Sequence, residues 1–271
     1  MARVIASWLG TAGLVLLGAC SFQPGSSATI DASSDASADA SPDAPADASP
    51  DAPADAMPPQ VAAVSAATVG AASNSSTLIY SLTIPAGTSR FLLVSVQLGT
   101  NCPSGLVPNT LSVTYNGVAL IPITAIVGTP CGATTTRSEQ WQLVAPATGM
   151  HDVVVTLSAD AKTVHSGAMA FTGIDQLSPV RSTATASGAG TSSSVTVASA
   201  VGDLVVNTVG QGNSITAPGA GQTQQFLHNV DSSNTLNNSA GSTAPGAASV
   251  TMTWTFGSTD EWQTISSSLR P

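Results

Sequence analysis

The stretch ASVTMTWTF, residues 248–256, decides the fold class. Large apolar residues alternate with threonines along it, and in a β-strand such alternation puts the apolar side chains on one face and the hydroxyls on the other. The apolar residues are Val250, Met252, Trp254 and Phe256. The stretch therefore predicts a strand with one buried face.

Similar short segments recur down the chain between clusters of Gly, Pro, Asn and Ser, and no segment has a sustained helical period. Around a dozen strands over residues 60–271 predict an all-β domain, a single antiparallel β-sandwich with a jelly-roll-like strand order. No internal repeat is visible within this domain. The expected strands are 61–67, 77–84, 91–98, 111–115, 118–126, 138–144, 152–157, 164–172, 194–199, 203–209, 223–229, 248–256 and 261–269.

The strongest turn signal is Asn116-Gly117, which separates the two strand-like halves of LSVTYNGVAL. Asn-Gly readily takes the two positive φ angles of a type I′ turn, the tight connection that matches the twist of paired strands. A β-hairpin is therefore expected at this point.

Residues 20–59 differ sharply in composition and contain a repeat of four residues that begins with Asp: DASS, DASA, DASP, DAPA. A helix is excluded because aspartates four residues apart would repel and the prolines would break the hydrogen-bond ladder. The segment predicts a disordered, extended spacer. Cation binding by the aspartates is the alternative, although calcium needs converging oxygen ligands that a mobile chain does not supply. The repeat aspartates are Asp31, Asp35, Asp39, Asp43, Asp47, Asp51 and Asp55.

Most of the net charge of −9 comes from this spacer. Residues from Met57 onward contain eight acidic and five basic residues and are therefore close to neutral. Only 8% of all residues are charged, against about 25% in average globular proteins. Low charge with abundant Val, Thr and Ser is typical of secreted β-proteins. The chain has no basic patch, so nucleic acid is not an expected partner.

Residues 1–19 have the features of a signal peptide: Arg3 precedes an apolar run that ends in small residues. The run is shorter than the roughly 20 residues of a membrane-spanning helix. LGAC, which ends at Cys20, resembles the lipobox of bacterial lipoproteins. That resemblance implies cleavage before Cys20, acylation of this cysteine and a stable membrane anchor. Ser21 in place of Asp favours the outer membrane. A plain secretory signal is the alternative.

Four further segments, EQWQLVAPATGMHDVVVTLS, AMAFTGIDQLSPV, GDLVVNTV and GSTAPGAASVTMTWTF, resemble parts of β-sandwich modules of secreted and cell-surface bacterial proteins. The resemblance covers roughly residues 62–271 and rests on strand and turn signatures. It implies the same sandwich fold and supplies no catalytic residue.

The domain contains two cysteines, Cys102 and Cys131, in the Pro/Gly-rich segments NCPSG and TPCGA. Export to an oxidising compartment predicts a disulfide between them. Closing a loop of about 30 residues would contribute on the order of 3.5 kcal/mol in the chain-entropy model. Neither cysteine has a His or Cys at ligand spacing, so no metal site is expected.

Catalytic motifs are missing from the sequence: it has neither G-x-S-x-G nor H-E-x-x-H. Asp175 and Asp203 stand at strand–turn boundaries, where Asp commonly caps a turn. Asp260 and Glu261 are adjacent and would point to opposite faces of a strand. The chain is therefore expected to be neither an enzyme nor a cofactor protein. A loop calcium held by Asp160, Asp231 and Asp260 stays an alternative. The histidines are scattered as His151, His165 and His228.

Aromatic residues could support ligand binding, because sugars stack on exposed rings. Trp254 alternates with core residues, and Trp141 alternates with Leu143, so both are expected to be buried. Trp262 follows STDE and is the best exposed candidate for a binding residue. The segment 211–241, rich in Asn and Gln, is expected to be a long loop.

These features together predict a surface or periplasmic lipoprotein. The acyl chains on Cys20 would insert into a membrane. The acidic spacer would connect this anchor to a non-catalytic β-sandwich with a structural or adhesive role. A carbohydrate-binding module and a hydrolase with an unrecognised active site are the alternatives. The expected partners are the membrane, through the lipid, and a glycan or surface-protein ligand.

Overall fold

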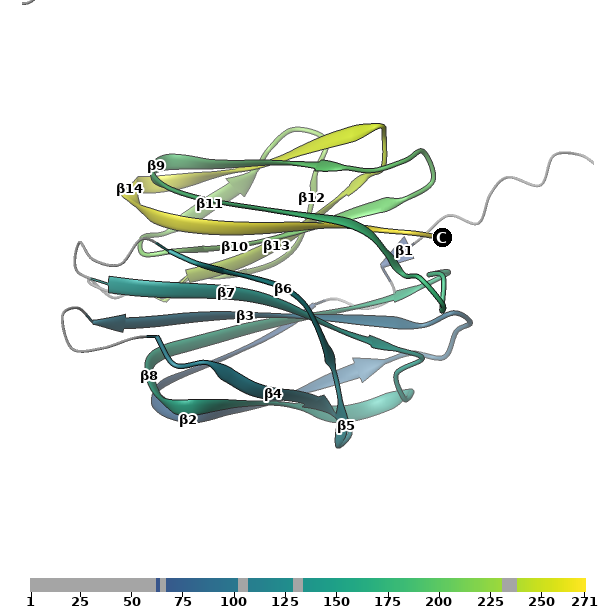
Figure 1. Ribbon diagram of the computed structural model, residues 1–271, viewed down its shortest axis with the longest axis horizontal. Helices are drawn as coiled ribbons and strands as arrows, with labels where there is room; N and C mark the ends of the chain where they lie inside the picture. Colours follow the sequence, from purple (N-terminus) through teal and green to yellow (C-terminus); the bar gives the residue numbers. More distant parts are fainter. Residues whose placement is uncertain (1–61, 64–66, 102–106, 129–133, 231–237) are drawn as a thin grey trace, which may run out of the picture. The chain divides into compact units, whose positions relative to one another are not determined.

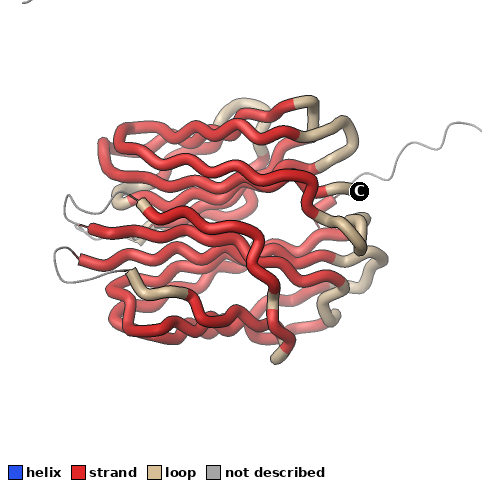
Figure 2. The backbone as a smooth tube through the Cα atoms, in the orientation of Figure 1, coloured by secondary structure: helices blue, strands red, loops and turns tan. Residues whose placement is uncertain are grey.

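The computed structural model describes residues 62–63, 67–101, 107–128, 134–230 and 238–271. All of them lie in one compact unit, Pro53–Pro271. In this part of the chain every regular element is a β-strand, and the strands form two antiparallel sheets (Figures 1 and 2). The predicted all-β class is confirmed. None of the described residues belongs to a helix that is long and apolar enough to cross a membrane.

The first sheet has the strand order β5-β4-β8-β3-β7-β6, and β1 and β2 also pair with β8. Strand β8 changes partners along its length: residues 153–157 pair with β4, whereas residues 163–171 pair with β3. The sheet therefore folds over itself. Its strands are β1 (Ala62–Ala63), β2 (Thr68–Ile84), β3 (Phe91–Asn101), β4 (Thr110–Tyr115), β5 (Val118–Ala119), β6 (Ile121–Val127), β7 (Thr134–Val144) and β8 (Gly149–Thr172).

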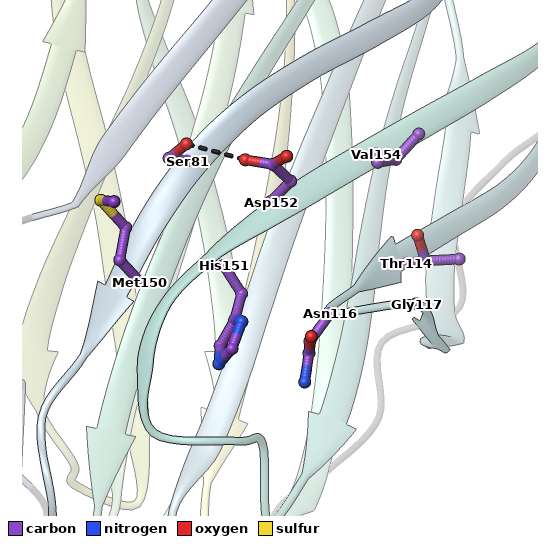
Figure 3. A pocket seen from close by; sticks show the side chains of 8 residues that line it. All are labelled: Ser81, Thr114, Asn116, Gly117, Met150, His151, Asp152 and Val154. Atoms are coloured by element: carbon purple, nitrogen blue, oxygen red, sulfur yellow. Dashed lines mark hydrogen bonds between the residues drawn. The ribbon is translucent and has the colours of Figure 1, made fainter.

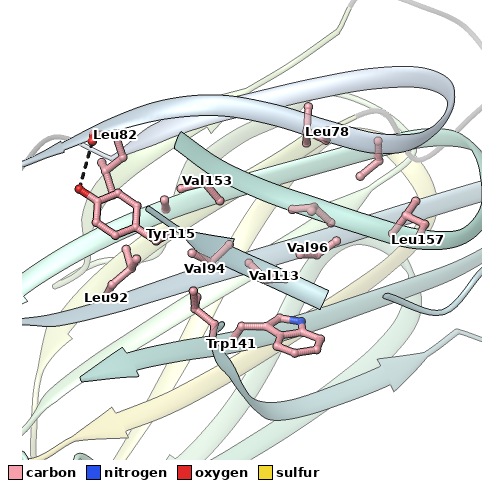
Figure 4. Close-up of a cluster of buried hydrophobic side chains, with 14 of the residues drawn as sticks. Leu78, Leu82, Leu92, Val94, Val96, Val113, Tyr115, Trp141, Val153 and Leu157 are labelled. Atoms are coloured by element: carbon pink, nitrogen blue, oxygen red, sulfur yellow. Dashed lines mark hydrogen bonds between the residues drawn. The ribbon is translucent and has the colours of Figure 1, made fainter. Parts of the chain in front are cut away.

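A hydrophobic core fills the inside of this folded sheet (Figure 4). Val94 on β3, Val113 on β4 and Val153 on β8 are fully buried in it. The ring of Tyr115 lies at one end of the core, where its hydroxyl donates hydrogen bonds to the carbonyl oxygens of Leu82 (3.4 Å) and Gly149 (3.0 Å). Burying these side chains stabilises the first sheet, because each large apolar side chain contributes roughly 1.5–3 kcal/mol.

The second sheet has the order β11-β14-β10-β13-β12, with β9 also paired to β14. Strand β14 changes partners as β8 does: residues 254–256 pair with β11, and residues 262–269 pair with β10. Trp254, which is fully buried, packs with Phe256 inside the fold of this sheet. The strands are β9 (Val180–Ala198), β10 (Leu204–Gln211), β11 (Ile215–Pro218), β12 (Thr223–His228), β13 (Asn238–Pro245) and β14 (Ser249–Leu269).

The two sheets repeat one pairing scheme. In the first, β8 pairs with β2, β3 and β4, and β7 pairs with β3 and β6; in the second, β14 pairs with β9, β10 and β11, and β13 pairs with β10 and β12. Irregularities of register also correspond: one lies between Pro122 and Thr124 on β6, and its counterpart lies between Gln224 and Phe226 on β12. The expectation that the domain has no internal repeat is wrong for its fold. We call residues 68–172 the first half and 180–269 the second half.

The halves pack against each other through β2, β6, β7 and β8 of the first and β9, β12, β13 and β14 of the second. Gln140 lies buried in this interface. Its side-chain nitrogen donates to Thr208 Oγ1 (2.9 Å) and to the carbonyl oxygen of Ile265 (3.3 Å), and its oxygen accepts from Ser267 Oγ (2.6 Å). An apolar cluster lies beside it, formed by Phe91, Leu93, Met169, Phe171, Ile174, Val206, Phe226 and Leu269.

Several predicted strands are wrong in length. The expected strands 152–157 and 164–172 form one strand, β8, and the last two expected strands form β14. Because both strands exchange partners where they bend, the polar residues at each bend interrupt the hydrophobic pattern without ending the strand. The expected loop 211–241 is also wrong, because it contains β11, β12 and the start of β13. The predicted turn is confirmed: Asn116 and Gly117 have φ of 51° and 72°.

Candidate functional site

An open hollow of about 560 Å³ lies on the outer face of β2, β8 and the β4–β5 turn (Figure 3). Strand pairing sets the position of the side chains, because Ser81 is directly opposite Asp152 and Val154 is directly opposite Thr114. The lining residues are Ser81, Thr114, Asn116, Gly117, Met150, His151, Asp152 and Val154.

The sequence of β8 explains why these groups face outward. Val153 and Val155 point into the core and are fully buried, so the intervening Asp152 and Val154 project from the opposite face. Met150 lies on the same outer face and is 71% exposed. The outer face of β8 therefore presents polar and apolar side chains to the solvent, while the inner face of the same strand is fixed in the core.

Hydrogen bonds hold the acidic side of the hollow in place. Ser81 Oγ donates to Asp152 Oδ1 (2.7 Å), and the backbone nitrogen of Asn116 donates to the carbonyl oxygen of Asp152 (3.1 Å). The second bond fixes the type I′ turn against β8, so that Asn116 and Asp152 both line the hollow. These groups can accept and donate hydrogen bonds to a ligand without rearrangement of the backbone.

The serine, histidine and aspartate of the hollow do not form a proton relay. Ser81 donates to the carboxylate, whereas His151 Nε2 lies 3.0 Å from the carbonyl oxygen of Thr148. The His151 ring packs edge-on against Tyr115, with ring centroids 5.6 Å apart. Ser81 is therefore not paired with His151 as a nucleophilic serine is paired with its base.

Exposed apolar side chains surround the hollow. Ile79 is 59% exposed and lies directly opposite Val154 on the outer face, and Val118 of β5 is also exposed. None of the Phe, Tyr and Trp rings that the structure describes is exposed. The site thus combines hydrogen-bonding groups with aliphatic surface.

Trp262, the predicted binding residue, is half-buried on β14 rather than exposed. Its ring covers Gly188 on β9, where an added Cβ would lie 2.8 Å from the ring atom Cζ2, and it packs beside the Trp254 cluster. The indole nitrogen is buried and has no hydrogen-bond partner in the part of the chain that the structure describes. Trp141 and Trp254 are buried as expected.

The remaining predicted site residues, Cys20, Cys102 and Cys131, lie outside the described residues, as do the predicted signal peptide and the linker up to residue 59. Lipidation and the disulfide therefore remain predictions. The described backbone bears on the disulfide in one respect. Asn101 and Thr134, the last described residues before and after these cysteine-containing segments, are directly paired on β3 and β7.

Both predicted turn-capping acids cap turns, and for Asp203 the capping contact comes from the backbone nitrogen of Ala200, which donates to Oδ2 (3.2 Å). Asp175 Oδ1 accepts from the backbone nitrogens of Leu177 (2.8 Å) and Ser178 (3.3 Å), which lowers the pKa of this carboxyl group. Burial by itself raises the pKa of Asp203, yet hydrogen bonds from Arg181 and Ser268 outweigh burial and leave this pKa below its usual value. Among the described residues no three His, Cys, Asp or Glu side chains converge as metal ligands, and Asp231 lies outside them.

Sequence reasoning missed one pair that the fold brings together. His165 on β8 and His228 on β12 are 63 residues apart, and their Nδ1 atoms lie 3.0 Å from each other across the interface between the halves. Burial lowers the pKa of His165 to about 3, with a further contribution from the charge of His228. Burial also lowers the pKa of His228. Both rings are therefore neutral at pH 7.

Comparisons with known proteins place the chain in no family. No family model matches it, and neither the curated proteins nor the solved structures include a match.

Proposed function

We propose that the chain is a lipid-anchored, exported protein whose β-sandwich units act as a non-catalytic binding module for another surface protein. Acylated Cys20 would provide the anchor, and the Asp-rich segment would hold the module away from the membrane, at the outer membrane. Within the module, the strand order that we propose is jelly-roll-like. The proposal rests chiefly on one observation: the hollow beside Asp152 offers fixed hydrogen-bonding groups with an exposed aliphatic rim.

A protein ligand fits this surface better than a glycan. Sugar sites rely on exposed aromatic rings for stacking, and every aromatic ring that the structure describes is at least half-buried. Met150, Ile79 and Val118 instead offer the aliphatic contacts that complement protein side chains. Asp152 and Asn116 would then fix the orientation of the ligand, as polar groups do in mostly apolar sites.

The disulfide between Cys102 and Cys131 belongs to the same proposal. Asn101 and Thr134 are paired on the adjacent strands β3 and β7. The segment with Cys102 begins after Asn101, and the segment with Cys131 ends before Thr134, so the two segments join the sheet at neighbouring positions. A bridge there would tie β3 and β7 together at this end of the sheet, in keeping with an oxidising location.

Changing Cys20 to Ser is expected to move the protein from the membrane fraction to the soluble exported fraction. The acyl chains contribute about 0.8 kcal/mol per buried methylene, so their loss removes the anchor. Fractionation together with intact-mass measurement checks this, with Cys131→Ser as the matched control that keeps the lipid. Membrane retention of Cys20→Ser with unchanged mass would contradict the anchor.

The binding role is tested by probing protein and glycan arrays with the purified chain. Wild type is expected to bind a surface protein, and Asp152→Ala is expected to weaken this binding at least tenfold, because a charge-assisted contact contributes about 1.5–3 kcal/mol. Trp262→Ala serves as the matched second-site variant and is expected to retain binding.

Other outcomes would each overturn a part of this proposal. Binding to glycans alone that is lost in Trp262→Ala would favour the carbohydrate-binding alternative, and binding to neither array would remove the adhesive role. Turnover of generic ester or glycoside substrates, abolished by an Asp or His substitution, would replace the non-catalytic role by a hydrolase.

A further inference from the structure

The interface between the two halves contains a belt of polar side chains. Across the first sheet, direct strand pairing places His165 beside Gln97 and Gln97 beside Ser138. Across the second sheet it places Gln263 beside Gly210, Gly210 beside Ser239, and Ser239 beside His228. We call these seven residues the polar belt: Gln97, Ser138, His165, Gly210, His228, Ser239 and Gln263.

The two rows of the belt face each other. His165 meets His228 across the interface, Nδ1 to Nδ1, at 3.0 Å. Gln97 approaches Gly210 so closely that an added Cβ there would lie 3.0 Å from Gln97 Cγ. Because paired residues on adjacent strands put their side chains on the same face, Gln97 lies next to His165, and Ser239 lies next to His228.

Buried polar atoms without partners are concentrated in this belt. Gln97 is 3% exposed and Ser239 is fully buried. Neither the Oε1 and Nε2 atoms of Gln97 nor the Oγ atom of Ser239 has a hydrogen-bond partner within the described part of the chain. Leaving such a group unsatisfied costs about 1–3 kcal/mol. Several such groups beside two converging imidazoles indicate that the belt accommodates something besides protein.

We propose that His165, His228, Gln97 and Ser239 bind a divalent late transition metal, with Zn²⁺ as the ion that fits this site. Imidazole nitrogens suit this class of metal, and the unpartnered Gln97 amide oxygen and Ser239 hydroxyl would supply weaker oxygen ligands beside them. At Zn–N distances of 2.0–2.1 Å, two nitrogens of a tetrahedral site lie about 3.3 Å apart. The two Nδ1 atoms are within a few tenths of an ångström of that spacing.

The protonation state of the two rings suits this role. Metal ions bind the neutral imidazole, and burial holds the pKa values of both rings below the ordinary value. Within the belt, His165 packs against the uncharged Gln97 and against His228, which is itself neutral at pH 7. An ion at this position would connect β8 of the first half to β12 of the second, and so would bind the folded chain only when the halves are packed together.

The repeated fold supplies matched substitutions. The pairing scheme equates Gln263 of β14 with His165 of β8, and Ile126 of β6 with His228 of β12. His165→Gln and His228→Ile therefore introduce side chains that the corresponding positions already accommodate. His151→Gln, far from the belt in the hollow of the outer face, is the control for adventitious histidine binding.

The experiment uses the full chain without a histidine tag, stripped with a chelator and titrated with Zn²⁺ in a calorimeter. One equivalent is expected to bind to wild type and to His151→Gln, whereas His165→Gln and His228→Ile are expected to lose at least tenfold in affinity. Thermal denaturation is expected to show a higher midpoint with Zn²⁺ for wild type and His151→Gln, and no such shift for His165→Gln and His228→Ile. Equal affinity in all four proteins would overturn the proposal and would place the ion elsewhere, for example on the aspartates of the linker.

A spectroscopic measurement on wild type keeps the test decisive if a variant fails to fold. Cu²⁺ added to the stripped chain is expected to give an electron paramagnetic resonance spectrum with hyperfine splitting from two imidazole nitrogens. A spectrum with oxygen ligands alone would overturn the proposal. It would leave the His165–His228 contact as an N–H···N hydrogen bond, with water on the unpaired glutamine and serine atoms.

Discussion

Replacing Gly167 with alanine is expected to lower the free energy of unfolding by about 3 kcal/mol. This is the upper end of the range for inserting an extra carbon group into a packed interior. An added Cβ at Gly167 on β8 would overlap the ring of Phe226, which reaches across from β12. The ring cannot retreat, because it also rests on Gly241 of β13, where another Cβ would overlap it. Phe226 is 5% exposed, so the clash must be relieved by separating the halves.

Urea denaturation followed by circular dichroism measures this effect, and Gly221→Ala supplies the comparison. Gly221 has a φ of +78° and nothing within 4 Å of an added Cβ, so only backbone strain of about 1 kcal/mol is expected there. Combining Gly167→Ala with Phe226→Leu is expected to recover part of the loss, giving a coupling of about 1 kcal/mol or more. If Gly167→Ala costs no more than Gly221→Ala, Phe226 does not hold the halves together as described.

The parts of the fold that depend on local pattern were predictable from the sequence. Alternation around Trp254 predicted a strand with a buried face, and Asn116-Gly117 predicted the turn, because both signals act within a few residues. The serine-, glycine- and alanine-rich sequences of β13 and of residues 180–193 of β9 carry no such signal. Those strands form because β14 and β10 offer them paired edges, which is a tertiary effect.

The candidate functional sites depend on contacts between residues that are distant in the sequence, so most of them could not be predicted from the sequence. Ser81 and Asp152 meet through the pairing of β2 with β8, and His165 meets His228 only through the packing of the two halves. Trp262 illustrates the opposite error. Its polar neighbours in the sequence suggested exposure, whereas Gly188 across the strand pair gives its ring a surface to cover.

The stability of the metal-free chain is expected to fall by about 2 kcal/mol between pH 7.5 and pH 5 because of His165 alone. In the unfolded chain this histidine titrates near the ordinary histidine pKa of 6.5, whereas burial lowers its pKa in the folded chain to about 3. The unfolded chain therefore binds the proton first. The stabilisation is complete above pH 6.5 and is lost progressively as the pH falls toward 3. His228, whose pKa is also lowered, acts in the same direction.

Denaturant titrations between pH 7.5 and 4.5, in the presence of a chelator, isolate this contribution. Asp175 and Asp203 have lowered pKa values, so the stability that they contribute is present above the ordinary carboxyl value of 3.8 and is lost only below it. His165→Gln is expected to remove most of the slope, whereas His151→Gln is expected to keep it. A slope that survives in His165→Gln would show that the ring is solvated and free to take up a proton, and the two halves would then not pack tightly around the belt.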